Sequence, residues 1–371
     1  MKSSENQEKN SGMNKSVAII GSVGIPAKYG GFETLAEYLT KNLSDKVDFT
    51  VYCSAKAYPK KLKEYNHSKL EYIPLKANGI QSIPYDIISL LKVKRKTKTV
   101  LILGVACGII LPLYRLFYSK KLIVNIDGLE WKREKWGKVA KWYLKFSEKV
   151  AVKSADVVIA DNKVIQDYVQ NEYGKNAVLI EYGADHSISL PLSDEIKKEF
   201  SFTNFEYAFK VCRIEPENNI KMILEAFSKQ TKYHLVIVGN WENSEYGIDL
   251  FSKFSKFENI HLCDPIYDLL ILNQLRSNAF LYIHGHSAGG TNPSLVEAMY
   301  LSIPIISFDI NYNRETTENK AYSYFKNSTE LVETLKNIDK TNLITSKNAL
   351  FIVAERRYQW ENITDKYLKK F

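Results

Sequence analysis

The sequence predicts an α/β protein with two doubly wound domains. Short apolar strands alternate with amphipathic helices along the chain, which implies parallel sheets covered by helices on both faces. At 371 residues the chain is too long for one comfortable core. The alternation lapses once, in the stretch YGADHSISLP at residues 182–191, where we expect one domain to give way to the next.

The expected strands follow this alternation in chain order. In the first half we predict strands at residues 17–20, 47–53, 70–73, 100–103, 122–126, 157–160 and 178–181. The helix after the first strand shows its apolar face in Phe32, Leu35, Ala36, Leu39 and Leu43, which recur at helical spacing. In the second half we predict strands at residues 207–212, 235–238, 260–262, 280–284 and 305–308. Each of these is followed by a helix or by a loop of the kind that binds ligands.

The two ends of the chain differ from this pattern. Residues 1–15 lack an apolar stretch, so they cannot be a signal peptide and are expected to form a disordered leader. We assign residues 16–184 to an N-terminal domain, 185–345 to a C-terminal domain and 346–371 to a helical crossover. The crossover is unusually aromatic, and we expect it to pack back on the first domain.

Charge and cysteine content limit the classes of function. The net charge of +9 favours an anionic partner, which could be a nucleotide, a nucleic acid or a membrane surface. No helix-turn-helix, RNA-recognition or zinc pattern supports a nucleic-acid binder. The four scattered cysteines indicate a reducing cytoplasm rather than a disulfide framework. The most apolar window, residues 100–113, is too short to span a bilayer and is expected to form a strand and a buried helix start.

The most informative stretch is HGHSAGGTNPSLVEAMY, in which a small-residue loop leads from a strand into a helix. Asn292 is expected to cap the helix, and Pro293 fits its first turn. Gly289 and Gly290 let the backbone approach a ligand, and the helix dipole adds roughly half a positive charge. Glu297 lies one turn in and can reach hydroxyl groups on a bound phosphate compound. The alternative is an ordinary strand, turn and helix.

A second glycine-rich loop, GSVGIPAKYGGFE, follows the first strand. Its spacing is not the dinucleotide fingerprint, which disfavours a nicotinamide enzyme. We interpret it as a loop that closes on a ligand between the domains; the alternative is a plain solvent loop. The candidate residues in it are Gly24, Lys28, Tyr29, Gly30 and Gly31.

Basic residues after a strand of the second half complete the anion site. Arg213 follows the strand directly, and its planar guanidinium suits diphosphate oxygens. Lys221 lies early in the next helix and can equally be a solvated helix charge. Ligands of doubly wound sheets gather at the carboxyl ends of strands, so Arg213 and the GGTNPS loop are expected to share one diphosphate.

Across the cleft, the sequence VNIDGLEWKREKWGK places Asp127 directly after a strand, where it can touch a substrate hydroxyl. Between residues 131 and 149 there are seven Lys or Arg against two Glu, interleaved with large aromatic side chains. This pattern indicates an amphipathic surface that binds anionic lipid. The alternative is a core-facing aromatic stripe with a solvated lysine face.

Metal binding has little support. Of the six histidines only His284 and His286 are close in sequence, and no Cys or Asp ligand lies near them. There is also no Asp-x-Asp pair, the usual device for holding a divalent ion on a nucleotide diphosphate. We therefore expect neither a metal nor another cofactor.

The motifs GSVGIPAKYGGFET, NIDGLEWKREKWG, ADN, EYGAD, RIEPENN and HGHSAGGTNPSLVEAM occur in one order. This set resembles one group within glycosyltransferase family 4, which contains bacterial β-1,4-rhamnosyltransferases of capsule and cell-wall polysaccharide synthesis. The resemblance runs over residues 17–325. It implies the GT-B fold, with the donor nucleotide on the second domain and the acceptor on the first.

The resemblance also implies roles for individual residues. Arg213 would hold the donor diphosphate and Glu297 the ribose or deoxyribose. The donor loop would comprise Gly289, Gly290, Thr291, Asn292 and Ser294. Asp127, Lys132, Asp161 and Tyr182 would border the reacting sugar or the acceptor phosphate. Two positions depart from the broader family: Gly289 replaces the first glutamate of its paired motif, and Asn218 replaces a frequent lysine, which shifts diphosphate binding onto Arg213 and Lys221.

The implied activity is a retaining glycosyl transfer, with L-rhamnose from dTDP-rhamnose as the expected donor and a lipid-linked saccharide as the acceptor. The protein would be cytoplasmic and peripherally bound to the inner face of the cell membrane. Two alternatives remain: a glycosyltransferase that uses a UDP-sugar, and a sugar-nucleotide epimerase or hydrolase on the same fold.

Overall fold

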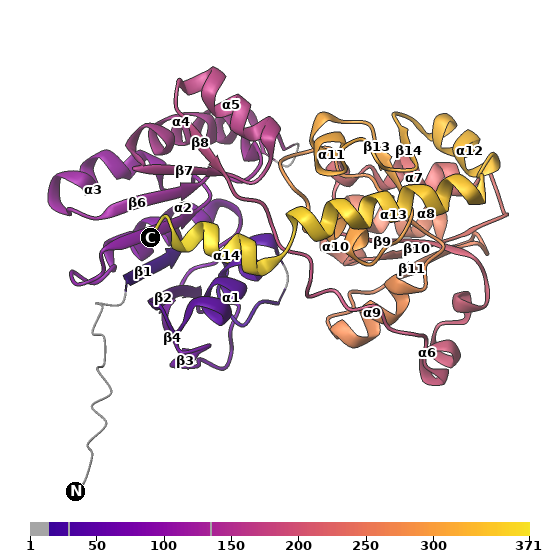
Figure 1. Ribbon diagram of the computed structural model, residues 1–371, viewed down its shortest axis with the longest axis horizontal. Helices are drawn as coiled ribbons and strands as arrows, with labels where there is room; N and C mark the ends of the chain where they lie inside the picture. The colour runs from indigo at the N-terminus through magenta and orange to yellow at the C-terminus, as the bar shows by residue number, and fades with distance from the viewer. Residues whose placement is uncertain (1–14, 29, 134–135) are drawn as a thin grey trace, which may run out of the picture.

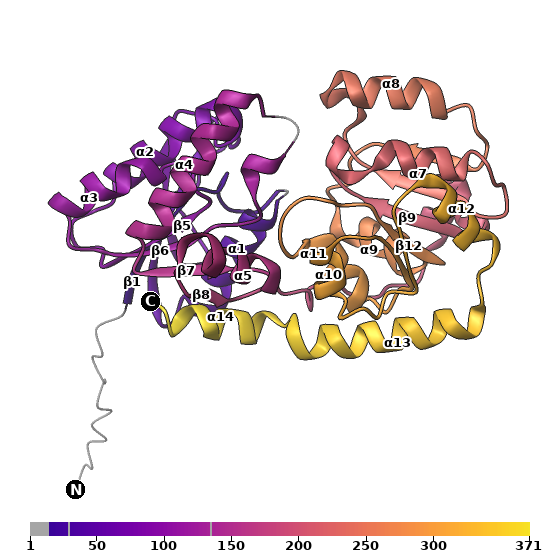
Figure 2. The same ribbon diagram turned by 90° about the horizontal axis from the view of Figure 1, so that it is seen from above.

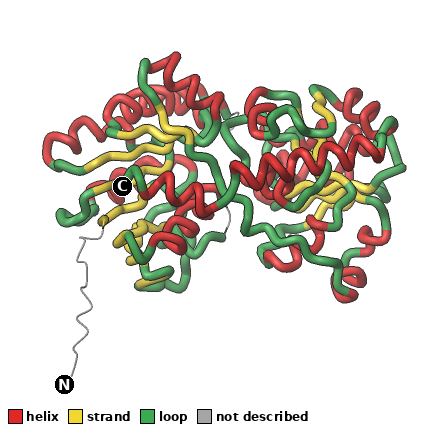
Figure 3. Tube along the Cα trace, in the orientation of Figure 1, coloured by secondary structure: helices red, strands yellow, loops and turns green. Residues whose placement is uncertain are grey.

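The computed structural model describes residues 15–28, 30–133 and 136–371. They form two α/β units, each with a sheet between layers of helices (Figures 1 and 3). The expected fold class is therefore confirmed. The predicted leader lies outside the described residues, apart from residue 15.

The first sheet has eight strands in the order β3-β4-β2-β1-β5-β6-β7-β8. All neighbours pair in parallel except β3 and β4, which are antiparallel. The order reverses between β1 and β5, so the loops that follow these strands diverge at a topological switch point, where ligands of such sheets bind. The strands are β1 (Lys15–Ile20), β2 (Val47–Ser54), β3 (Glu64–Tyr65), β4 (Ser68–Ile73), β5 (Thr99–Leu103), β6 (Lys121–Asn125), β7 (Val157–Ala160) and β8 (Ala177–Leu179).

The second sheet has six parallel strands in the order β11-β10-β9-β12-β13-β14. Its switch point lies between β9 and β12. The segment that carries Arg213 follows β9 and the glycine-rich donor loop follows β12, so the topology brings them to one edge, as predicted. The strands are β9 (Tyr207–Val211), β10 (His234–Val238), β11 (Ile260–Cys263), β12 (Leu281–His284), β13 (Ile305–Phe308) and β14 (Ser323–Phe325).

Fourteen α-helices lie in the described part of the chain. In the first unit α2, α3, α4 and α5 contribute to the core on one face of the sheet, and α1 and α14 to the core on the other. In the second unit α9, α10 and α13 cover one face and α7, α8 and α12 the other. The helices are α1 (Gly31–Leu43), α2 (Ser82–Leu91), α3 (Leu111–Phe117), α4 (Lys138–Ser154), α5 (Lys163–Tyr173), α6 (Asp194–Glu199), α7 (Ile220–Phe227), α8 (Glu245–Phe254), α9 (Leu269–Ser277), α10 (Pro293–Tyr300), α11 (Asn311–Thr316), α12 (Ser328–Lys336), α13 (Lys340–Arg357) and α14 (Trp360–Leu368).

The C-terminal helices join the two units. Helix α13 packs on α10 of the second unit, and α14 packs on α1 of the first, so the chain returns along one side of the molecule (Figure 2). The predicted crossover is confirmed, although it consists of two helices and begins at Lys340 rather than at residue 346. Trp360 and Tyr367 of α14 are buried in the core of the first sheet.

Several sequence expectations need correction. Strands β3 and β14 were not predicted, because with two and three residues they are too short to show alternation. The helical part of the window 100–113 is buried on one side only: Cys107 and Leu111 are fully buried, whereas Ile109 is 44% and Leu113 49% exposed. In the part of the chain that the structure describes, no helix combines the length and apolarity needed to cross a membrane.

Candidate active site

The start of α10 has the local structure that its sequence predicts. Asn292 is the N-cap, and its side-chain oxygen accepts a hydrogen bond from the Ser294 amide at 3.1 Å. Pro293 occupies the first turn, and Gly289 has a φ of +89°, which favours glycine. The loop therefore leads into the positive end of a helix, which is a favourable place for an anion.

The first unit contacts this loop closely. A Cβ atom on Gly128, in the segment after β6, would lie 2.1 Å from the Gly289 Cα atom. One on Gly290 would lie 1.8 Å from an Asp161 carboxylate oxygen, and one on Gly31 would lie 3.3 Å from Pro293 Cγ. The N-termini of α1 and α10 thus face each other, and the candidate site lies between the two units.

Asp161 forms a polar link between the units. Its Oδ2 atom accepts a hydrogen bond from the Thr291 amide at 3.1 Å, and its backbone carbonyl accepts one from the Thr291 hydroxyl at 2.5 Å. Burial, together with repulsion from Asp127, raises the pKa of Asp161 well above its ordinary value. The residue predicted to border the reacting sugar therefore also holds the donor loop.

Asp127 lies at the mouth of the site, with a φ of +60° that turns the chain sharply after β6. Its carboxylate lies 3.8 Å from the guanidinium of Arg133. Arg133 also forms an ion pair with Glu130 at 2.8 Å, and its side chain is only 11% exposed. Sequence reasoning selected Lys132 instead, but that residue is exposed and its ammonium group lies 5.4 Å from the Trp131 ring centroid. Lys132 and Arg133 are neighbours with the same charge, so the sequence does not show which of the two side chains points into the protein.

Most of the glycine-rich loop after β1 packs within its own unit. A Cβ on Gly24 would lie 2.5 Å from the sulfur of Cys53, and one on Gly30 would lie 1.9 Å from a carboxylate oxygen of Glu33. Lys28 donates a hydrogen bond to the Ala57 carbonyl at 2.7 Å, so it lies against the first unit rather than in the cleft. Tyr29 lies outside the described residues. Of the predicted loop residues described, Gly31 is the one that meets the second unit.

Glu33 is a buried carboxylate that sequence reasoning missed as a candidate. Its Oε1 atom accepts a hydrogen bond from the Val23 amide at 2.6 Å and so fixes the loop after β1. Burial raises the pKa of Glu33, and the charge of Arg213 across the cleft acts in the opposite direction. The sequence does place Glu33 in the first turn of a helix, but acidic residues are common at helix N-termini, so this position does not by itself indicate a functional residue.

The side chain of Arg213 is 46% exposed, and its guanidinium lies 3.8 Å from the Glu215 carboxylate. The Asn218 amide donates to the Arg213 carbonyl at 2.8 Å and its oxygen lies 2.9 Å from His286 Nδ1. The asparagine thus joins the Arg213 segment to the loop after β12. Lys221 is 67% exposed and lies 3.9 Å from Glu225 one turn along α7, so it behaves as a solvated helix charge.

Glu297 lies in α10 as predicted, and both of its carboxylate oxygens have partners. Its Oε1 atom lies 3.1 Å from His186 Nε2, and its Oε2 atom accepts a hydrogen bond from the buried guanidinium of Arg276. Burial favours the neutral acid, but Arg276 and His186 outweigh it and lower the pKa of Glu297 to about 2. Neither partner was predicted, because both are distant from Glu297 in sequence.

The remaining candidates are buried. Tyr182 is 3% exposed, and its ring lies close to Gly31: a Cβ atom added to Gly31 would lie 3.5 Å from Tyr182 Cζ. Tyr182 therefore forms part of the floor of the site. His284 and His286 are 1% and 8% exposed. Among the described residues, no group of three or more His, Cys, Asp or Glu side chains could hold a metal ion.

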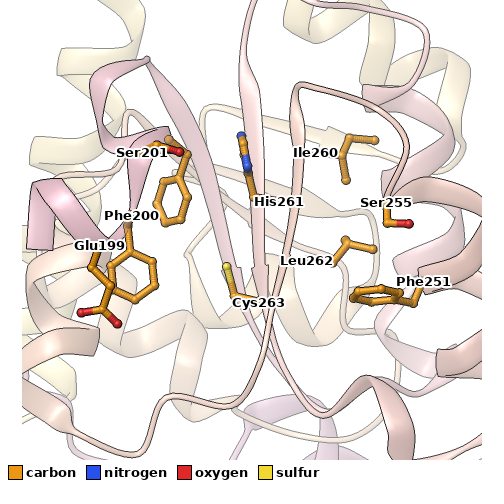
Figure 4. Close-up of a pocket in the computed structure, with 10 residues that line it drawn as sticks. Glu199, Phe200, Ser201, Phe251, Ser255, Ile260, His261, Leu262 and Cys263 are labelled. Atoms are coloured by element: carbon orange, nitrogen blue, oxygen red, sulfur yellow. The ribbon is translucent and has the colours of Figure 1, made fainter.

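A cavity of about 380 Å³ lies elsewhere, beside β11 at the edge of the second sheet (Figure 4). Phe200, Phe251, His261 and Cys263 are among its lining residues. None of the predicted donor or acceptor residues lines it. The site formed by the predicted residues therefore lies at the interface between the units, away from this cavity.

Both halves of the chain match known protein families. Residues 193–349 match the family model "Glycosyl transferases group 1", and residues 14–185 match a domain of unknown function, DUF1972. The matches support a GT-B glycosyltransferase. An uncharacterized glycosyltransferase of Methanocaldococcus jannaschii is 22% identical over 387 residues, covering 92% of this chain and 94% of that protein.

Solved structures share the complete two-domain architecture. A sucrose-phosphate synthase from Thermosynechococcus elongatus superposes with a TM-score of 0.79 at 14% identity, covering 96% of this chain and 98% of that one. The Anabaena protein HepE, solved with UDP-glucose, gives a TM-score of 0.74 at 13% identity with the same coverage. An UDP-N-acetylglucosamine 2-epimerase candidate from Listeria monocytogenes gives a TM-score of 0.58 at 13% identity, covering 95% and 94%. At these identities the likeness shows the fold.

Proposed function

We propose that this protein transfers L-rhamnose from dTDP-rhamnose to a lipid-linked saccharide in capsule or cell-wall polysaccharide synthesis, with retention of the anomeric configuration. The observation that carries the proposal is the close approach of the loop before α10 to the first unit, at the same edge of the second sheet as the segment that carries Arg213. The second domain, 185–345, would bind the donor and the first, 16–184, the acceptor. The rhamnose assignment rests on the motifs of the sequence.

In the proposed reaction the bond between the anomeric carbon and the donor phosphate oxygen breaks, and the acceptor oxygen bonds to the same face of that carbon. The departing phosphate oxygen takes the acceptor proton. Arg213 and the amides of the donor loop stabilise the diphosphate charge. Asp161 and Asp127 lie at the carboxyl ends of strands that face the loop, where they border the transferred sugar.

The test of this function is a panel of donors supplied with a lipid diphosphate-linked glucose or N-acetylglucosamine. Labelled dTDP-rhamnose is expected to transfer more sugar than UDP-glucose, UDP-N-acetylglucosamine or GDP-mannose. Preference for a UDP-sugar would establish the second candidate, which the likeness to HepE with its bound UDP-glucose favours. Donor breakdown without an acceptor product would instead support an epimerase or hydrolase.

Arg213→Ala is expected to lower transfer by about tenfold or more, because a charge-assisted hydrogen bond to the diphosphate is worth about 1.5–3 kcal/mol. The half-exposed side chain contributes little to packing, so the melting temperature is expected to stay unchanged. The matched control is Lys253→Ala, which removes an exposed cation 2.8 Å from Asp249 on α8. Equal transfer by the parent and Arg213→Ala would remove this residue from the donor site.

We further propose that transfer needs no divalent metal, since the loop amides and Arg213 supply the charge that the leaving diphosphate requires. Transfer is expected to continue in excess chelator. The measurement is the initial rate with and without chelator on extensively dialysed protein. Complete loss of activity, restored by magnesium or manganese, would contradict this part of the proposal.

We propose that the protein binds the inner membrane face through α3 and α4. Exposed apolar side chains lie on both of these contacting helices, and α4 also carries exposed lysines. The largest exposed fractions are those of Leu116 (78%), Phe117 (73%), Val139 (82%) and Trp142 (69%). Trp142 stacks on Phe146 with ring centroids 5.9 Å apart. Exposed aromatic and apolar groups with a cationic rim are typical of helices that lie in a bilayer interface.

Anionic vesicles are expected to co-sediment with the protein, and the fraction bound is expected to fall with salt, because the Debye length decreases from about 10 Å at 0.1 M to about 3 Å at 1 M. Phe117→Ala and Trp142→Ala should each weaken binding, whereas Ile352→Ala, which shortens a side chain that is 64% exposed on α13, should not. Equal binding of all three variants would show that α3 and α4 are not the contact surface.

A further inference from the structure

A chain of hydrogen bonds runs from the C-terminal crossover to the carboxylate on α10. The indole Nε1 of Trp360 donates to His186 Nδ1 at 3.0 Å, and His186 Nε2 lies 3.1 Å from Glu297 Oε1. An indole N–H can only donate, so His186 Nδ1 must accept and carries no proton. The remaining ring proton of the imidazole is then on Nε2, where it is donated to Glu297.

Trp360 itself is held rigidly. Its ring stacks on Tyr38 of α1, with centroids 4.4 Å apart and an interplanar angle of 5°. Its backbone amide donates to the Asp185 carboxylate at 2.9 Å. A Cβ on Gly183 would lie 2.4 Å from the indole, so the segment that links the two sheets packs directly against the ring. The two connections between the units are thus joined at Trp360, which is anchored on the first unit.

The other oxygen of Glu297 is fixed from the second unit. Arg276, whose side chain is 3% exposed, donates to Oε2 and also to Asn273 at 2.9 Å and Ser187 at 3.2 Å. With both oxygens bound, the orientation of the carboxylate is set by one group from α9 and one from the linker. The path from the Glu297 carboxylate to the first unit runs through His186 to Trp360, which stacks on Tyr38.

We propose that His186 is a positioning residue for the donor: it orients Glu297 and couples that orientation to the crossover helix anchored on the first unit. The inference rests on the proposed function, since it requires that Glu297 contact the donor nucleoside. It goes beyond that function because His186 and Trp360 touch neither the diphosphate loop nor the reacting centre in this arrangement. A change at Trp360 should therefore alter donor affinity without a change in the chemical step.

The experiment measures binding of UDP and of dTDP to the full chain by calorimetry. Trp360→Phe keeps an aromatic ring against Tyr38 but removes the N–H donor, and His186→Leu removes both contacts. Trp360→Phe is expected to bind the nucleotide about threefold to tenfold more weakly, the effect of one hydrogen bond, and His186→Leu is expected to lose at least as much affinity. His186→Gln should stay within about twofold of the parent, because the amide oxygen can accept from Trp360 while the amide nitrogen donates to Glu297.

In the transfer assay, Trp360→Phe is expected to raise KM for the donor and leave kcat unchanged, as for a contact made equally in the ground and transition states. The matched control is His234→Leu, which removes a 2.8 Å contact between His234 and His261 on the far edge of the second sheet. Thermal melting shows which variants are folded. If His186→Leu does not fold, the nucleotide affinity of Trp360→Phe tests the inference.

Parental affinity in Trp360→Phe would overturn the inference. Equal losses in His186→Gln and His186→Leu would also overturn it, because a purely steric role would not be rescued by the amide. Failure of the parent protein to bind either nucleotide would instead reject the proposed function. The two ideas therefore fail in distinguishable ways.

Discussion

Glu297→Ala is expected to lower the free energy of unfolding by about 3–5 kcal/mol, because it leaves the buried Arg276 guanidinium without its carboxylate partner. It should also weaken donor binding, since the group that would contact the nucleoside is lost. Glu297→Gln keeps the volume and one acceptor oxygen, so its stability loss should be smaller. Denaturant unfolding measures the first effect, and nucleotide titration of the folded fraction measures the second.

Glu225→Ala is the control for this prediction. Glu225 also faces a cation, Lys221 at 3.9 Å, but both side chains are well exposed. Removal of such a surface pair typically changes stability by less than about 1 kcal/mol. If Glu297→Ala were as stable as Glu225→Ala, the ion pair with Arg276 would not be part of the folded protein.

Gly128→Ala is expected to lower kcat/KM by about a hundredfold or more, because a displacement of about 1 Å can cost that much in catalysis. The added Cβ would lie 2.1 Å from the Gly289 Cα atom, and backbone cannot yield as a flexible side chain can. The units would have to stay further apart. Each sheet has its own buried cores, so the melting temperature should change little.

The neighbouring control is Gly137→Ala, since a Cβ at Gly137 would meet no atom within 4 Å. Both positions lie in the segment between β6 and α4, so general effects of alanine in this segment are matched. Steady-state rates of both variants are compared with those of the parent. Parental kcat/KM in Gly128→Ala would show that the close approach of the two units is not needed for transfer.

The sequence is sufficient to predict the elements that are defined locally. The cap at Asn292, the proline after it and the glycine at 289 act within a few residues, so the local structure at the start of α10 could be predicted. The apolar face of α1 is similarly local, and Leu35 and Leu39 are buried as expected. Parallel sheets followed from the alternation of such elements.

The contacts between distant residues that complete the site could not be predicted from the sequence. Asp161 and Thr291 are 130 residues apart, and His186 and Glu297 are 111 apart, so no periodicity relates them. Arg276 is one basic residue among many on helices, and only the fold shows that it is buried against Glu297. Sequence resemblance suggested roles for Asp161 and Glu297, but their partners come from tertiary structure alone.

Determination of the structure with UDP or dTDP bound tests the central claim most directly. We expect the diphosphate within hydrogen-bonding distance of the amides at the N-terminus of α10 and of the Arg213 side chain, with the nucleoside toward Glu297. A nucleotide bound in the cavity beside β11, or at any site away from the interface between the two units, would contradict the account.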